Sequence, residues 1–302
     1  MIRPGPTRAA VRLARDELSY LAWEPRGVPN GRTALLLHGL QSNAVTMTTI
    51  AEALAARGWR AIAPDLPGHG HTYALDGSDR ERPGPFDTSR LALVRLRADR
   101  RFRIASTARV VADLGRRIGL ERPAVVGHSW GASVASLVPL EGLACERLVL
   151  FDPPYLTEEE ARAMGAEVVA ETTRSRQEAR STLESEHSDW GEADLEGKSE
   201  ALTQVSNRVM IGIVAANVPF DPTPALLALR KKRPGLPVSA IVGEPAFGSM
   251  VPDEARGRLI DLLGEANVQL LRGAGHSFHR THFEAFLAML VRALADTDRA
   301  PG

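Results

Sequence analysis

The chain has 302 residues, of which 44% are hydrophobic and 25% charged, enough apolar material for the core of one large domain. Its 37 basic and 37 acidic side chains give a formal net charge of zero, so we expect neither nucleic acid nor a membrane surface as a partner. The single cysteine, Cys145, excludes an intrachain disulfide. No apolar run reaches the length of a signal peptide or membrane span, which makes the cytoplasm the expected location. A homodimer stays open as the assembly.

Short leucine-rich or β-branched runs alternate with helical patterns along the chain, which predicts a mostly parallel sheet flanked by helices. A hairpin is expected first, at residues 12–27. The further expected strands, which bring the sheet to eight, are 33–39, 59–65, 123–129, 147–152, 237–243 and 267–273. The expected helices are 44–57, 105–118, one that begins at Trp130, and 281–295.

Two charged segments interrupt this alternation. Residues 76–104 carry eight arginines against five acids, and residues 157–200 carry thirteen acids against five basic side chains. The pattern favours solvated charged faces in both, and the order and role of 76–104 stay open. We expect residues 156–225 to form a helical cap over the sheet, with 1–155 and 226–302 as the core.

A short motif, Gly127-His128-Ser129-Trp130-Gly131, lies where an expected strand meets an expected helix. A serine hydroxyl is a poor nucleophile at neutral pH unless it is held exposed beside a base. A tight strand-turn-helix exposes it, because small residues on both sides let the backbone pass closely. The helix that follows directs its N-terminal amides toward a developing oxyanion. The motif therefore predicts a nucleophilic serine, Ser129.

Four segments, in this order along the chain, resemble the α/β-hydrolase superfamily in its cap-bearing branch of esterases, lactonases, epoxide hydrolases and dehalogenases. They are "LLLHGLQSN" (35–43), "APDLPGHG" (63–70), "VVGHSWGA" (125–132) and "GAGHSFHRTHFEAF" (273–286). The resemblance extends over residues 17 to 295 and implies the α/β-hydrolase fold with a helical cap insertion.

The resemblance also implies roles for particular residues. His276 matches the general base of the family, on the turn after the last strand. The amides of Leu40 and Trp130 match the two oxyanion-hole donors, while the side chain of His38 is expected only to brace its loop. These roles describe a Ser–His pair that still needs an acid.

The position of that acid is the main departure from the family. In most members it lies in the loop after the penultimate strand, where this chain has Ala246. Three candidates remain: Glu244 in the same loop, Asp253, which reads as a helix N-cap, and Asp152, which follows the strand next to that of the nucleophile. Some members keep their acid after that strand. We favour Asp152 over Glu244 and Asp253.

The remaining histidines have no clear part in this chemistry. His279 and His282 are expected behind the site or at the surface, and His69 and His71 in a loop. No His/Cys/Asp grouping has the spacing of a zinc site, so neither a metal nor a cofactor is expected.

A serine nucleophile and only three tyrosines favour attack on an ester or lactone carbonyl over epoxide or halide chemistry. We expect a small hydrophobic substrate that is cleaved through an acyl-serine intermediate. Four residues are expected to line its pocket: Met210, Ile213, Val214 and Phe247. The open alternatives are hydrolysis of a carbon–carbon bond, cofactor-free peracid formation, and a hydrolase-fold protein that binds a ligand with little turnover.

Overall fold

The computed structural model describes residues 5–75, 100–172 and 175–295. Their nine strands form one sheet in the order β1-β2-β4-β3-β6-β7-β8-β9, with β5 paired to β2. The pairs from β4 to β9 are parallel, and β1, β2 and β5 pair antiparallel. The strands are Thr7–Arg12 (β1), Asp16–Trp23 (β2), Thr33–Leu37 (β3), Arg60–Pro64 (β4), Tyr73–Ala74 (β5), Ala124–His128 (β6), Arg147–Phe151 (β7), Val238–Val242 (β8) and Val268–Leu270 (β9).

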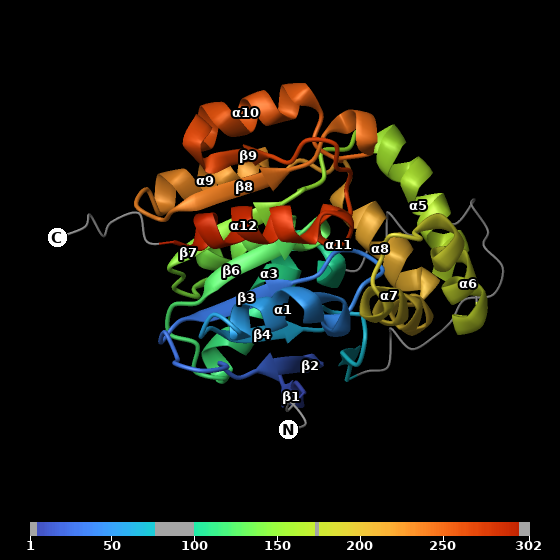
Figure 1. The fold of residues 1–302 in the computed structure, drawn as a ribbon, viewed down its shortest axis with the longest axis horizontal. Coiled ribbons are helices and arrows are strands. Elements are labelled where there is room, and N and C mark those ends of the chain that lie inside the picture. Colours follow the sequence, from blue (N-terminus) through green and yellow to red (C-terminus); the bar gives the residue numbers. More distant parts are fainter. Residues whose placement is uncertain (1–4, 76–99, 173–174, 296–302) are drawn as a thin grey trace.

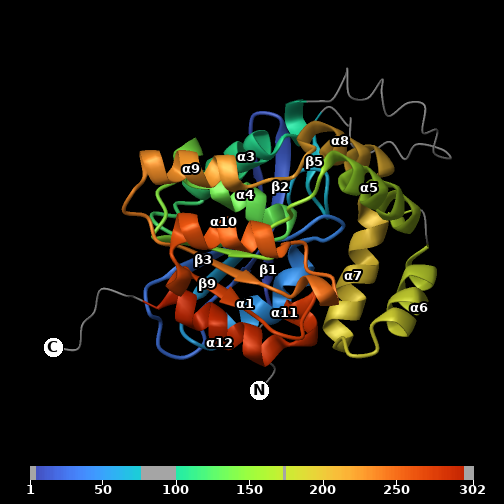
Figure 2. The same cartoon turned by 90° about the horizontal axis from the view of Figure 1, so that it is seen from above.

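Helices cover both faces of the sheet, which gives three layers (Figures 1 and 2). The core on one face packs α1 (Thr48–Ala55) and α12 (Phe283–Leu294) against the strands. The core on the other face contains α3 (Ile104–Arg117), α4 (Trp130–Leu137), α9 (Thr223–Lys232) and α10 (Asp253–Leu263). The central parallel strands are buried throughout, because helices cover them from both sides.

Four helices follow β7 and gather at one end of the sheet, before the chain returns to β8 (Figure 1). They are α5 (Glu158–Thr172), α6 (Arg176–Glu186), α7 (Glu192–Gln204) and α8 (Asn207–Asn217). A small core of their own includes Leu183, Trp190 and Leu202. The carboxyl ends of the parallel strands, where ligand sites of open α/β sheets lie, face these helices. We call α5–α8 the cap.

The architecture agrees with the α/β-hydrolase fold expected from the sequence, and the differences are local. The hairpin begins at Thr7, earlier than expected, and β5 was not expected. The helix expected at 44–57 starts with a 3-10 turn, Ala44–Met47, before α1. Helix α9 begins inside the range expected for the cap but packs against α4. Most of the arginine-rich segment 76–104 lies outside the described residues.

Close packing between cap and core at Gly212 of α8 yields a stability prediction. A Cβ at this position would lie 2.6 Å from Cδ2 of the buried Phe102 ring, whereas one at Gly257 of α10 would meet nothing within 4 Å. We expect Gly212→Ala to lower the free energy of unfolding by about 1–3 kcal/mol through overpacking. Gly257→Ala should raise it by about 0.5–1 kcal/mol through helix propensity. Urea denaturation measures both, and equal effects would contradict the packing.

Candidate active site

Ser129 lies at the turn between β6 and α4, with φ 53° and ψ −125°. A Cβ at Gly127 would collide with the carbonyl oxygen of Gly131, and a Cβ at Gly131 with the carbonyl oxygens of Leu37 and His38. Only glycine fits at either position, so the sequence motif is explained by the closeness of three backbone segments. The turn holds the serine at the carboxyl end of the sheet.

Backbone strain is concentrated at this end of the sheet. Among the described residues, the non-glycine residues with positive φ are Gln41, Ser129 and Asp152. They follow β3, β6 and β7, which are neighbours in the sheet. Such conformations cost free energy and persist where the surrounding structure fixes them, most often at functional sites.

The sequence leads us to expect the backbone amides of Leu40 and Trp130 as oxyanion donors, and both residues lie next to the turn that holds Ser129. A Cβ at Gly39 would lie 3.1 Å from Cβ of Ser129, so the loop after β3 passes directly over the serine. Within the described residues, no hydrogen bond engages the amide of Leu40 or of Trp130. Both N–H groups are therefore available to an oxyanion.

His38 fixes this loop without facing the cavity. Its Nδ1–H donates to the carbonyl of Gly39 (2.8 Å), and its Nε2 accepts from the amide of Leu66 (3.0 Å). Burial lowers the pKa of His38 to about 4, so the ring is neutral and keeps this tautomer. The bracing role expected for the side chain agrees with these contacts.

Asp152 follows β7, the strand beside that of Ser129, and its carboxylate contacts His276. The distance from Asp152 Oδ2 to His276 Nδ1 is 2.6 Å. The amide of Ser129 donates to Phe151 O (3.0 Å), which ties the two strand ends together. Since Nδ1–H donates to the carboxylate, His276 presents its Nε2 for proton transfer.

The loop where most family members carry the acid instead supplies hydrogen bonds to Asp152. Oδ1 accepts from the amide of Gly243 (3.1 Å) and from Oγ of Ser249 (2.6 Å), and Oδ2 accepts from the amide of Met250 (2.9 Å). Burial alone raises the pKa of Asp152, but hydrogen bonds from His276, Ser249 and Met250 outweigh it and hold the pKa below its ordinary value. The buried carboxylate is therefore ionised at neutral pH.

The other acids considered from the sequence have different partners. Glu244 Oε2 accepts from the amide of Gly273 (2.6 Å), and Oε1 lies 3.6 Å from Arg272. Glu244 thus holds the turn that leads to His276 and does not contact the imidazole. Asp253 is exposed in the first turn of α10 and pairs with Arg256 at its surface. Of the three, Asp152 is the residue that meets His276.

His128, inside the motif, supports His276 from one side. Its Nε2–H donates to the carbonyl of His276 (3.1 Å), and the two rings lie 4.7 Å apart. The ring of His279 packs against that of His128 in a tilted arrangement, with centroids 4.2 Å apart. Burial lowers the pKa of both His128 and His279 well below the ordinary value, so both rings are neutral. His279 is therefore buried behind the site, while His282 is exposed.

A cavity of about 260 Å³ lies over Ser129 and His276, between the sheet and the cap. Within the described residues no hydrogen bond joins Ser129 Oγ to His276, a contact that often closes only with substrate. The apolar side chains that line the cavity are Leu40, Met164, Val168, Leu183, Trp190, Leu202 and Met250. The polar ones, apart from Ser129 and His276, are Gln41, Ser42, His128, Glu167, Glu171, Glu186, His187, Lys198, Ser277 and Arg280.

The four residues expected to line the pocket do not line this cavity, so that prediction is wrong. Met210, Ile213 and Val214 are buried inside the cap, where α8 packs against α5 and the core. Phe247 is 59% exposed on a surface turn. The apolar face of α8 stabilises the cap itself, and α5, α6 and α7 provide the cavity wall instead.

Several residues that shape the site were not singled out from the sequence: Gln41, Ser249, Lys198 and Arg280. Gln41 Nε2 donates to Val168 O (2.9 Å) and to Glu171 (2.8 Å), so the loop beside Leu40 is anchored to the cap. One feature of the sequence could have pointed to Ser249: it lies in the loop that carries the acid in most family members. The other three have no motif, because contacts across the tertiary structure bring them to the cavity.

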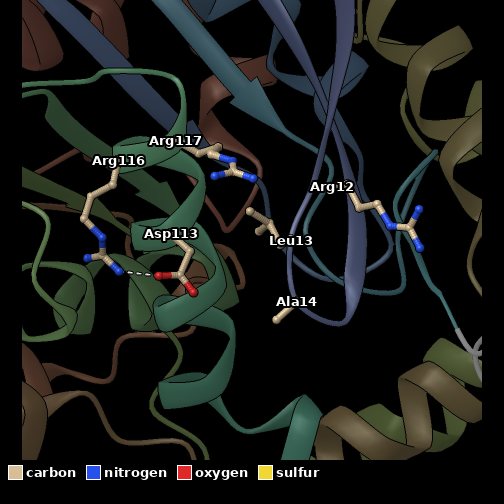
Figure 3. A pocket seen from close by; sticks show the side chains of 6 residues that line it. All are labelled: Arg12, Leu13, Ala14, Asp113, Arg116 and Arg117. Carbon is tan, nitrogen blue, oxygen red and sulfur yellow. Dashed lines mark hydrogen bonds and ion pairs between the residues drawn. The ribbon is translucent and has the colours of Figure 1, made fainter.

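A second, more open hollow of about 690 Å³ has an entirely different lining (Figure 3). The end of β1 and the turn after it provide Arg12, Leu13 and Ala14, and α3 provides Asp113, Arg116 and Arg117. Arg116 pairs with Asp113 there (Figure 3). Its described lining contains no serine, cysteine or histidine, so the Ser129 cavity is the better candidate for chemistry.

The described residues also lack the features of two other classes of site, a metal centre and a membrane span. Residues 5–75, 100–172 and 175–295 contain no group of three or more His, Cys, Asp or Glu arranged to hold a metal ion. Over the same ranges, every helix is too short or too polar to span a bilayer.

The Asp152–His276 contact can be tested without a substrate. The proton between His276 Nδ1 and a charged carboxylate should give a strongly deshielded ¹H NMR signal, because charge-assisted hydrogen bonds are short and strong. We expect Asp152→Asn to abolish this signal and Glu244→Gln to retain it. The opposite result would assign the contact to Glu244.

Comparisons with known proteins identify the family of the chain. Residues 34–289 match the alpha/beta hydrolase family. The uncharacterized protein Rv2715 of Mycobacterium tuberculosis is 34% identical over 106 residues, which are 35% of this chain and 24% of that protein. The chain thus spans about a quarter of the length of this relative.

Solved structures share the fold at low identity. E-2-(acetamidomethylene)succinate hydrolase superposes with a TM-score of 0.70 at 19% identity, over 96% of this chain and 99% of that one. A variant of the N-acyl homoserine lactonase AidH gives a TM-score of 0.66 at 17% identity, over 98% and 99%. Since the family match extends over most of the sequence and the architecture agrees, the chain belongs to the alpha/beta hydrolase family.

Proposed function

We propose that the protein is a serine hydrolase that cleaves a carboxylic ester or lactone through an acyl-serine intermediate on Ser129. The observation that carries this proposal is the 2.6 Å contact between Asp152 and His276, beside a serine in a strained strand-to-helix turn. An ionised, buried carboxylate orients the imidazole and stabilises it once it is protonated.

In the proposed reaction, Ser129 Oγ attacks the carbonyl carbon while His276 Nε2 takes its proton. The amides of Leu40 and Trp130 bind the oxygen on which negative charge develops. The intermediate collapses as His276 returns the proton to the leaving alcohol, and the acyl-serine remains. A water molecule, activated by His276, then releases the acid and restores Ser129.

The cavity supports a small substrate with an apolar part, because Val168, Leu183, Trp190 and Leu202 from the cap line it. Its volume of about 260 Å³ lies just below the range typical of drug-sized ligands. Lactones stay in the candidate class, since the lactonase AidH has this fold. Carbon–carbon bond hydrolysis or peracid formation would use the same residues, and no contact in the cavity favours either.

A ligand-binding protein with little turnover was considered because Ala246 stands where most family members carry the catalytic acid. Asp152 supplies a carboxylate to His276 from another strand, so that reason no longer holds. We therefore prefer the hydrolase.

A panel of p-nitrophenyl esters and lactones tests the proposal. Asp152→Asn should lower kcat about 10³- to 10⁴-fold, because the imidazole loses its orienting charge. Ser129→Ala should abolish labelling by a fluorophosphonate, and the unaltered protein should be labelled at Ser129.

Glu244→Gln is the matched control, since it alters the neighbouring acid and leaves the Asp152 contact in place. Its effect on kcat should be at least tenfold smaller than that of Asp152→Asn. A folded protein whose Ser129 resists the label would overturn the acyl-serine mechanism.

A further inference from the structure

Two cations lie inside a cavity that the sequence predicted to be apolar. Lys198 of α7 and Arg280 of α11 (Phe278–Thr281) both line it. The side chain of Arg280 is only 5% exposed, and Lys198 is half-buried. The proposed mechanism uses neither residue, although burying charged groups is costly unless they are paired.

Protein contacts use only part of the hydrogen-bonding capacity of these two residues. Lys198 Nζ donates to the carbonyl of Gln41 (3.0 Å), which leaves two of its N–H groups. Arg280 lies over the ring of Trp190 at 4.5 Å, and its Nε lies 3.4 Å from Asp194 Oδ1. Among the described residues, none forms a hydrogen bond with either Nη nitrogen of Arg280. Donors of both side chains are thus available to a bound molecule.

The negative charges near Lys198 do not compensate for its burial and for the positive charge of Arg280. Burial first, and then the charge of Arg280, lowers the pKa of Lys198 to about 8, and Glu171 raises it by less. Glu167 and Glu186, the other acids that line the cavity, are exposed to solvent, which screens them. An anion between Lys198 and Arg280 would relieve their repulsion.

We propose that Lys198 and Arg280 bind a carboxylate of the substrate, so that the preferred substrates are small esters or lactones that carry a free carboxylate. The inference rests on the proposed hydrolase function and names its substrate class. It replaces the expectation of a purely hydrophobic substrate.

A hydrogen bond links Lys198 to the loop of a reacting group, and chain position links Arg280 to His276. Lys198 is bonded to Gln41, which directly follows the oxyanion donor Leu40. Arg280 lies about one helical turn beyond His276, on the short helix that follows it. A carboxylate held there would lie on the cap side of Ser129 and orient the ester carbonyl toward it. The small cavity volume suits a short acyl chain between the two groups.

The test compares p-nitrophenyl hydrogen adipate with its methyl ester, which has nearly the same shape and lacks the charge. The unaltered protein should turn over the acid with a kcat/KM at least about tenfold higher than that of the methyl ester. Lys198→Met and Arg280→Met should each lower this ratio about tenfold, since each removes a charged hydrogen-bond donor. Lys198→Arg should restore most of it.

Arg162→Met on the outer face of α5 and Lys232→Met at the end of α9 are matched controls and should leave the ratio unchanged. Arg280→Met also removes the contact with Asp194 and could therefore unfold the protein. In that case, the result for Lys198→Met alone decides the test. A ratio near one in the unaltered protein, or a ratio that neither variant changes, would overturn the proposal.

The failure of this inference differs from the failure of the proposed function. Cleavage of the methyl ester with labelling of Ser129, but without preference for the acid, would refute the carboxylate site alone. Absence of both turnover and labelling would refute the serine-hydrolase function, and the inference with it.

The preference for the acid should also depend on pH. Lys198 is protonated below its pKa of about 8, so the ratio of kcat/KM for acid over methyl ester should fall as pH rises through this value. Lys198→Arg stays charged, so its ratio should be flat over the same range. A ratio that falls equally in both proteins would show that another group titrates.

The groups that face Lys198 support this assignment. Arg280 and Glu171 approach it from α11 and α5. Five imidazoles within its electrostatic range have pKa values lowered by burial and stay uncharged near pH 8: His38, His69, His128, His187 and His279.

Discussion

The site depends on one buried charge, the carboxylate of Asp152 at the end of β7. It is fully buried, and four donors satisfy its two oxygens. An ion removed from water costs several kcal/mol unless such bonds replace its hydration. Three donors come from the loop after β8, and the fourth is His276 itself. The position and tautomer of the imidazole therefore follow from the solvation of this carboxylate.

The need to solvate Asp152 explains the role of the loop after β8, which its composition does not indicate. The stretch Ala246–Met250 has no acid, yet Ser249 and the amide of Met250 hydrogen-bond to one. Glu244, the acid of this loop, instead fixes the turn before His276 through the amide of Gly273. Because the carboxylate follows β7, the loop after β8 contributes hydrogen-bond donors to the site in place of an acid.

The cap is coupled to the chemistry through Gln41, the strained residue after Leu40. Its side chain is held by Val168 and Glu171 of α5, and its carbonyl by Lys198 of α7. Cap helices thus fix the loop that carries Leu40 and bring polar groups into the cavity. In the proposed mechanism, the contacts that hold the oxyanion donor Leu40 therefore come from the same helices that line the cavity.

The sequence by itself determined the fold class, the strand order of the motifs, and the strand-turn-helix at Ser129, because buried parallel strands and glycine-flanked turns leave local patterns. The resemblance to the α/β-hydrolases also narrowed the acid to Asp152, Glu244 and Asp253, because family members carry it either near the loop after the penultimate strand or after the strand next to that of the nucleophile. Only the tertiary structure decided which carboxylate meets His276, because that depends on donors in a loop almost a hundred residues away. It likewise decided the lining of the cavity. The apolar pattern of α8 indicates a buried face, but it does not indicate which element packs against that face. In the sequence, Lys198 and Arg280 look like surface charges, because only the packing of the cap on the core brings both into the cavity.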